Sequence, residues 1–180
     1  TVWNWWRALK CFTAEANKVS QQKIDDRSSI NAPQTSFKLV HQRVSNMRHW
    51  WPEPAAGDIV WCHFPDQISD KPKARPGLLL SVHEIDDGHY TVDLAYGTSQ
   101  KVERLYAGEF SITQAKHPIA FSSSNLSYDT KFNLRQVVNL PFNSDWFSVA
   151  PQAPHGQNPK LGLLHASMVP KVQAAFKRSR

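Results

Sequence analysis

The sequence predicts an α+β fold that is mainly β. It comprises a small β-barrel domain at residues 55–180, closed by a C-terminal helix and preceded by a helical pair in residues 1–54. Three observations predict this fold. Apolar residues recur every three or four positions up to residue 51, as on one face of a helix. From Gly57, short apolar segments alternate with turn-forming residues, as in small barrels. The helical period returns near the C-terminus.

Two amphipathic helices are expected before residue 55. The first, over residues 2–24, has an apolar face formed by Trp5, Leu9, Phe12, Ala16 and Val19. Turn-forming residues at 25–33 end it. The second begins at Thr35 or Ser36, and its apolar face consists of Phe37, Val40, Val44, Met47 and Trp51. It ends before Pro52-Glu53-Pro54, because proline disfavours helix at the preceding residue. Residues 1–54 are therefore predicted to be a basic, tryptophan-rich helical extension.

Short strands are expected next. Residues 59–61 form the first, and the nearly continuous apolar run at 78–82 predicts a second strand in the centre of the sheet. Asp86-Asp87-Gly88 is typical of a hairpin turn, and residues 90–96 predict a third strand that ends at Gly97.

The second half of the barrel is expected to contain two more strands and a helix. The strands are residues 110–112 and 134–140, the latter ended by Pro141, and the intervening Ser122–Asn125 is expected to be a loop. Residues 151–159, with three prolines and a glycine, predict another loop. Residues 167–177 predict a helix whose apolar side carries Met168, Val172 and Phe176.

Positive charge is concentrated at the two ends of the chain. Residues 1–50 hold eight Lys/Arg against three acids, residues 51–170 hold nine against twelve, and residues 171–180 hold four with no acid, for a net charge of +6. Such ends favour a polyanionic partner, because neutralised phosphates supply affinity that is independent of sequence. The alternative is that both termini are simply solvated.

Several classes of protein are disfavoured by what the sequence lacks. It has no apolar run long enough to span a membrane and no signal-peptide pattern at its start. It also has no Walker loop, dinucleotide motif, nucleophile elbow or zinc-ligand spacing. Cys11 and Cys62 are expected to be reduced thiols in a cytoplasmic protein. We therefore expect no metal, no other cofactor and no membrane partner.

A cationic cluster marks the start of the second expected strand. Pro76 biases Arg75 toward an extended backbone, which would project its side chain from the rim of the sheet. Lys71 and Lys73 lie just upstream. Clustered cations at the mouth of a sheet suit a phosphate group. The alternative is a solvated basic loop.

A polar motif follows the third expected strand, at Tyr96-Gly97-Thr98-Ser99-Gln100. Glycine lets a ligand approach the backbone closely, and hydroxyl and amide groups can hydrogen-bond it. In an antiparallel sheet this end can lie beside Arg75 at the start of the second strand. The alternative is an ordinary polar turn.

The segments Gly57-Asp58-Ile59-Val60-Trp61 and Arg75-Pro76-Gly77-Leu78-Leu79-Leu80-Ser81 resemble the first two strands of the PemK/MazF toxin family. Residues 126–134 resemble further core strands of that family more loosely, and residues 159–162 with the terminal helix fit its closing helix. The resemblance covers roughly residues 55–178 and implies an SH3-like barrel. It also implies a metal-independent endoribonuclease, the toxin of a toxin–antitoxin system, that pairs as a homodimer and has a cognate antitoxin.

The resemblance also implies site residues. Arg75 and Thr98, with Ser99 as a near alternative, fall on the family's catalytic positions. An acidic residue often assists in family members, and the candidates for that role are Asp93 and Asp129. The residues expected to bind single-stranded RNA are Lys71, Lys73, Tyr96, Gly97, Gln100 and Trp61. Trp61 and Tyr96 would stack unpaired bases, although a core position is the more common role for a residue such as Trp61.

Two other interpretations stay open at this point. The barrel could be a non-catalytic module that binds nucleic acid or protein, with the N-terminal helices as its effector or assembly element. Alternatively, those helices could cover the rim as an antitoxin segment would, through Trp3, Trp5 and Trp6.

Overall fold

The computed structural model describes residues 51–65, 73–86, 88–151 and 158–180, and its main element is a six-stranded antiparallel sheet. The strands are β1 (Asp58–Phe64), β2 (Lys73–Asp86), β3 (His89–Thr98), β4 (Glu109–Ile112), β5 (Thr130–Pro141) and β6 (Lys160–Leu163). Their order is β4-β5-β3-β2-β1-β6. The described helices are α2 (Pro118–Ser124), a 3-10 turn (Ala166–Met168) and α3 (Val169–Ser179). The expected helical pair in residues 1–54 lies outside the described residues, except for residues 51–54.

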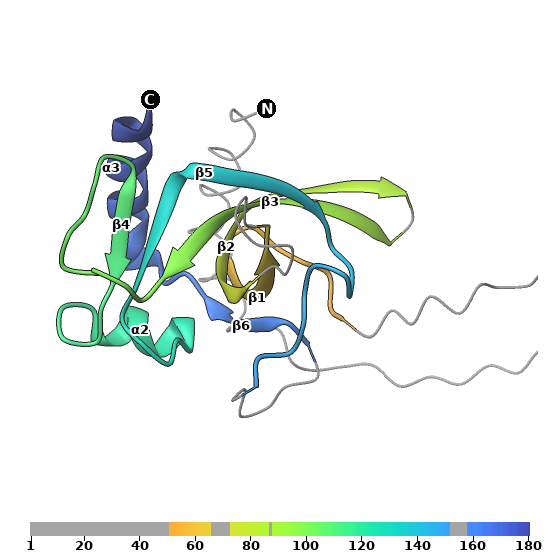
Figure 1. Cartoon of the computed structure of the whole chain (residues 1–180), viewed down its shortest axis with the longest axis horizontal. Helices are drawn as coiled ribbons and strands as arrows, with labels where there is room; N and C mark the ends of the chain where they lie inside the picture. Colours follow the sequence, from red (N-terminus) through yellow and green to blue (C-terminus); the bar gives the residue numbers. More distant parts are fainter. Residues whose placement is uncertain (1–50, 66–72, 87, 152–157) are drawn as a thin grey trace, which may run out of the picture.

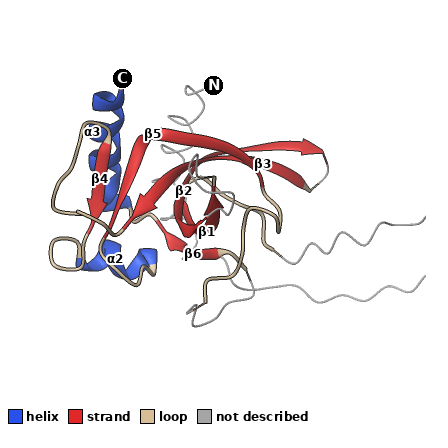
Figure 2. Cartoon of the chain, viewed as in Figure 1, coloured by secondary structure: helices blue, strands red, loops and turns tan. Residues whose placement is uncertain are grey.

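The sheet curls into a half-barrel (Figure 1). Helix α3 packs against β4 and β5 at one edge of the sheet, and α2 contacts β6 at the opposite edge. Because the sheet is curled, both helices lie on the same side of the molecule (Figure 2). The prediction of a small, mainly β fold with a C-terminal helix is confirmed at this level. No helix in the described part of the chain is long and apolar enough to cross a bilayer.

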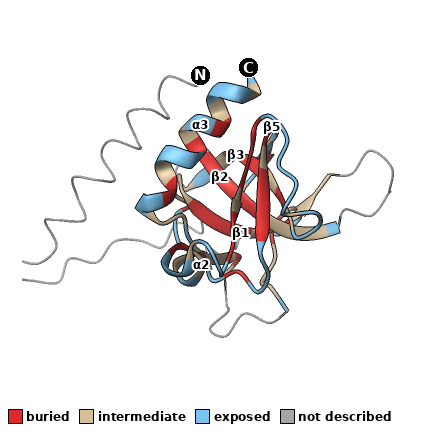
Figure 3. Cartoon of the chain, turned by 90° about the vertical axis from the view of Figure 1, so that its left-hand side faces the viewer, coloured by how far each residue is buried: buried red, intermediate tan, exposed pale blue. Residues whose placement is uncertain are grey.

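Apolar side chains are buried on both faces of the central strands. Along β2, Leu78 and Leu80 belong to one core cluster, whereas Leu79 between them belongs to a second. This alternation follows from the two-residue period of a strand. A strand covered on both faces needs a continuous apolar run, which explains the composition of residues 78–80. Figure 3 shows the buried residues concentrated in the strands, with α3 exposing its outer side.

The first core cluster lies between the sheet and the helices. Phe110 of β4 stacks on Phe132 of β5, with ring centroids 5.4 Å apart. Met168 and Val172 are fully buried in the same cluster, and Phe176 packs against it. The predicted apolar side of the C-terminal helix is therefore confirmed. The helix begins with a proline in its first turn, where a missing N–H costs no hydrogen bond.

The predicted hairpin and strands are present, but β3 continues beyond its predicted end. Gly97 was expected to terminate the strand, and this prediction is wrong, because Gly97 pairs with Phe132 and the strand extends to Thr98. A Cβ atom at position 97 would lie 2.5 Å from the Pro76 carbonyl oxygen. Glycine is required here because the β2 backbone and the Phe132 side chain of β5 both come close to position 97 of β3. It is not required for a turn.

Two other segments differ from their predicted structure. Residues 122–124, expected to be loop, form the last turn of α2, in which the Ser124 hydroxyl donates to the Phe121 carbonyl oxygen at 2.7 Å. Asn125 ends that helix in the left-handed region, with φ of 50°. Residues 160–162, expected to belong to a closing helix, form strand β6.

Strand β6 is held on β1 by backbone pairing and by an ion pair. Lys160 Nζ lies 2.8 Å from Oδ1 of Asp58, whose side chain is almost fully buried. Gly162 packs so tightly on α2 that a Cβ there would lie 2.4 Å from the Ser123 carbonyl oxygen. These contacts join residues about 40 to 100 positions apart in the chain, so no local sequence pattern predicts them. Residues 160–163 form a strand because they pair with β1 and pack on α2.

Cys62 is expected to be chemically inert in the folded protein. It is fully buried on β1, and burial raises the pKa of its thiol to about 12. Because the thiolate is the reactive form, iodoacetamide at pH 8 should leave Cys62 unmodified in the native protein and alkylate it in denaturant. Peptide mass spectrometry distinguishes it from Cys11. Rapid native labelling of Cys62 would contradict the buried position of this strand.

Candidate functional site

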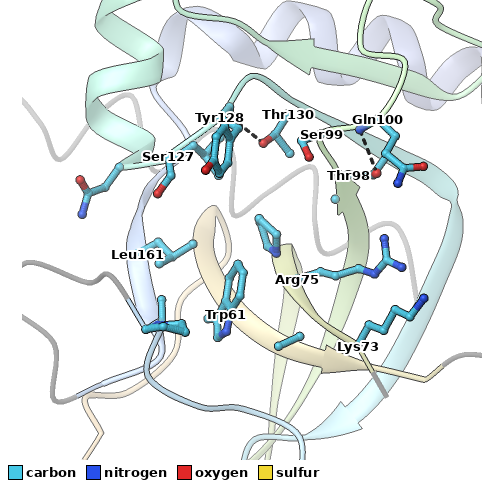
Figure 4. Close-up of a pocket in the computed structure, with 17 residues that line it drawn as sticks. Trp61, Lys73, Arg75, Thr98, Ser99, Gln100, Ser127, Tyr128, Thr130 and Leu161 are labelled. Carbon is cyan, nitrogen blue, oxygen red and sulfur yellow. Dashed lines mark hydrogen bonds between the residues drawn. The ribbon is translucent and has the colours of Figure 1, made fainter. Parts of the chain in front are cut away.

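A cavity of about 730 Å³ opens where the start of β2 meets the end of β3. Its walls come from four regions of the chain: β1 with β2, the end of β3 with the residues that follow it, the segment from the end of α2 to the start of β5, and Ala150, Pro151 and Leu161 before and in β6 (Figure 4). β2 and β3 are antiparallel, with Gly77 paired to Tyr96. The register therefore brings the residues before Gly77 and after Tyr96 to the same edge of the sheet. The predicted convergence of the two motifs is observed.

Arg75 is a half-buried cation on the cavity wall. It is the third residue of β2, and Lys73 at the start of this strand lines the same cavity. Both residues belong to a paired strand and not to a loop, and Lys73 is exposed whereas Arg75 is half-buried. Lys71 lies outside the described residues.

Tyr96 fixes the position of the Arg75 side chain. Nη1 of Arg75 donates a hydrogen bond to the Tyr96 hydroxyl at 2.5 Å, and the guanidinium carbon lies 5.0 Å from the Tyr96 ring centroid. The Tyr96 ring in turn packs edge-on against Phe64, at 5.2 Å between centroids. Among the described residues the Arg75 side chain makes no other hydrogen bond, so its remaining guanidinium N–H groups are available to a ligand.

Tyr96 itself is not part of the cavity wall, although it was expected to bind RNA. Gly97, Thr98, Ser99 and Gln100 all line the cavity. The Gln100 backbone N–H donates to Oγ1 of Thr98 at 3.2 Å. This bond occupies an acceptor position of the hydroxyl and leaves its proton free to be donated, which suits a phosphate oxygen.

Trp61 also lines the cavity. It is half-buried and pairs with Pro76 across the β1–β2 ladder, but it belongs to neither buried core cluster. The backbone around it is fixed, since its N–H donates to the Pro159 carbonyl oxygen at 2.7 Å. Trp61 is therefore not a core residue, which was the alternative to a ligand-binding role. Its indole lines the cavity, where a ligand can contact it.

The segment from the end of α2 to the first residue of β5 supplies cavity residues that the sequence did not single out as site residues. They are Asn125, Leu126, Ser127, Tyr128 and Thr130. Their only local signal is a polar, turn-like composition, which many surface loops share. Long-range pairing of β5 with β3 brings this segment to the site.

Neither candidate acid lies in the cavity. Burial raises the pKa of Asp93, but hydrogen bonds from Ser81, Asn139 and His83 outweigh burial and hold that pKa below its ordinary value. Asp129 accepts from the Gln114 backbone N–H at 2.7 Å. Among the described residues, no carboxylate or imidazole lines the cavity, and no cluster of metal-ligating side chains occurs. The ionic character of the described wall is therefore cationic.

Neither a family model nor a curated protein matches this chain significantly. The likeness to PemK/MazF proteins consequently rests on the two strand motifs described above. The geometry of the cavity is an independent observation, because it depends on strand register and not on that likeness.

Proposed function

We propose that this protein is a metal-independent endoribonuclease of the PemK/MazF type, built on an SH3-like barrel, that cleaves single-stranded RNA. One observation carries the proposal: Arg75 and Lys73 line the same cavity as Thr98 and Ser99. Among the described residues, no acidic side chain lines this cavity. A phosphodiester is the ligand that best matches two cations and adjacent hydroxyl donors.

The proposed reaction uses the RNA as its own nucleophile. The 2′-oxygen forms a bond to the adjacent phosphorus, the bond from phosphorus to the 5′-oxygen breaks, and the products carry a 2′,3′-cyclic phosphate and a 5′-hydroxyl. The proton leaves the 2′-hydroxyl for solvent, and the departing 5′-oxygen takes up another from solvent. Arg75 would hydrogen-bond the charged phosphorane, with Thr98 or Ser99 donating to a second oxygen. Donors preorganised toward developing charge usually make the largest catalytic contribution.

Proton transfer is the weaker part of this site. The described cavity wall supplies no histidine or carboxylate, and a guanidinium is a poor proton carrier. General acid–base catalysis typically contributes ~10²–10⁴-fold to a rate. We therefore propose an enzyme that relies on charge stabilisation and is slower than nucleases with a positioned acid and base.

The biological setting belongs to the same proposal. The protein would act as a toxin in the cytoplasm, pair as a homodimer and be neutralised by an antitoxin protein. The basic segment 1–54 would supply additional phosphate affinity or act as a cover over the cavity.

The second candidate function is non-catalytic RNA binding in the same cavity. The absence of a general base from the described wall favours it specifically. The bound phosphate, cations and hydroxyls would be the same, and only cleavage would be missing.

The test is incubation of purified full-length protein with fluorescent single-stranded RNA in EDTA. We expect discrete fragments that end in a cyclic phosphate, which gel electrophoresis and mass spectrometry detect. Intact RNA that nevertheless binds in a polarisation assay would overturn the enzyme and support the binding module. RNA that neither binds nor breaks would contradict both candidates.

A further inference from the structure

The cavity has two chemically different sides. Lys73, Arg75 and Gln100 lie on one side, whereas Trp61, Leu161 and Tyr128 line the other (Figure 4). Trp61 and Tyr128 come from opposite walls of this second side, one from β1 and the other from the segment before β5. A mixed cationic and aromatic lining is more than a lone phosphate requires.

Tyr128 exposes 68% of its surface, and it lines the cavity. Hydrogen bonds nevertheless hold the backbone at Tyr128 and the side chain of the next residue. The Thr130 hydroxyl donates to the Tyr128 carbonyl oxygen at 2.8 Å, and Asp129 accepts from the Gln114 N–H. Because the exposed ring belongs to the cavity wall, a ligand in the cavity can contact it.

We infer that the aromatic side is a nucleobase subsite, which holds one unpaired base while Arg75 holds the neighbouring phosphate. This inference rests on the proposed function and names the part of the RNA that the second side recognises. A base can stack on the ring of Trp61 or Tyr128, and Ser127 beside them offers a hydroxyl donor and acceptor to the base edge. The volume of about 730 Å³ lies within the ~300–1,000 Å³ of typical small-ligand sites.

The charge pattern favours a nucleotide over an apolar ligand. An apolar ligand would leave Lys73 and Arg75 without a partner in the cavity, whereas a lone phosphate would leave the aromatic rings unused. One nucleotide unit carries both an anion and a flat π-face, and matches both sides at once. Tyr128 therefore becomes a base-stacking residue on a segment that the resemblance does not assign to the site.

The test compares the affinity of labelled 2′-O-methyl RNA hexamers with that of an abasic hexamer. The 2′-O-methyl group blocks self-cleavage, so fluorescence polarisation reports binding alone. Stacking of one base contributes about 1–3 kcal/mol, which corresponds to roughly 5- to 150-fold tighter binding. We expect at least one of the adenosine, cytidine and uridine hexamers to bind at least about fivefold more tightly than the abasic one. Tyr128→Ala should remove most of that advantage and leave abasic binding unchanged, and Tyr128→Phe should retain it.

Tyr106→Ala is the matched control, because Tyr106 is another exposed tyrosine but lies outside the cavity. Equal affinity of the abasic and base-bearing hexamers would overturn the subsite and leave the phosphate site standing. An equal effect of Tyr106→Ala and Tyr128→Ala would also overturn it. Failure of every hexamer to bind, the abasic one included, would contradict the proposed function as well.

Discussion

Replacing Arg75 with alanine is expected to lower the rate of RNA cleavage by at least about 100-fold. The loss of a single preorganised donor to a developing charge commonly costs ~10²–10³-fold in kcat. Arg75 has several N–H groups without a protein partner among the described residues, so it would contribute more than one such bond. Single-turnover cleavage of fluorescent RNA with enzyme in excess measures the chemical step directly.

Two variants make this test specific. Arg75→Lys keeps the charge but loses the planar fork of donors, so we expect only partial recovery of the rate. Arg178→Ala removes the same charge from an exposed position on α3, outside the cavity, and should retain nearly the full rate. If Arg75→Ala cleaves as fast as the unchanged protein, the observed activity does not come from this cavity. Similar losses in both alanine variants would indicate a general electrostatic effect.

The central strands and the Arg75 rim could be predicted because their signals are local. The run at residues 78–80 is apolar throughout since β2 is covered on both faces. Gly88, with φ of +78°, marks the hairpin that joins β2 to β3. The antiparallel pairing that follows places the start of β2 beside the end of β3. Once that hairpin was predicted, the meeting of Arg75 with Thr98 followed from antiparallel pairing.

The parts that were missed depend on contacts between distant segments. Strand β6 has only four residues and is defined by its pairing with β1. Ser122 to Ser124 have weak helix propensity, yet they complete α2 where its backbone packs on Gly162. Tyr128 reaches the cavity only because β5 pairs with the end of β3. Tertiary packing overrides local preference in each of these segments.

Tyr96 differs in position from the other residues of its motif. The pattern at residues 96–100 indicated a ligand site, and its last four residues line the cavity. Tyr96 was expected to stack a base, but its ring and hydroxyl contact Arg75. The sequence predicts that Tyr96 lies near the end of β3. Its contact with Arg75 depends on the register between β3 and β2, which the sequence does not show.

Replacing Lys131 with methionine is expected to lower the free energy of unfolding more than any other substitution we propose. Lys131 on β5 is 6% exposed, and its Nζ lies 2.9 Å from Oε2 of Glu109, itself 7% exposed. The same ammonium donates to the Arg104 carbonyl oxygen at 2.9 Å. Removing one partner of a buried ion pair costs about 3–5 kcal/mol, because the other charge stays buried without compensation. For a domain of this size, thermal denaturation should show a fall in Tm of roughly 10–20 °C.

The double variant Glu109→Gln/Lys131→Met separates the charge effect from lost packing. It removes both charges, so its free energy of unfolding should recover part of the loss seen with Lys131→Met alone. No recovery would show that the loss comes from packing and not from the orphaned carboxylate. The pair also bears on the site, because Lys131 pairs with Thr98 across the β3–β5 ladder. Lys131→Met should therefore weaken RNA cleavage even below its melting temperature, since the strand end that presents the Thr98 hydroxyl loses an anchored neighbour.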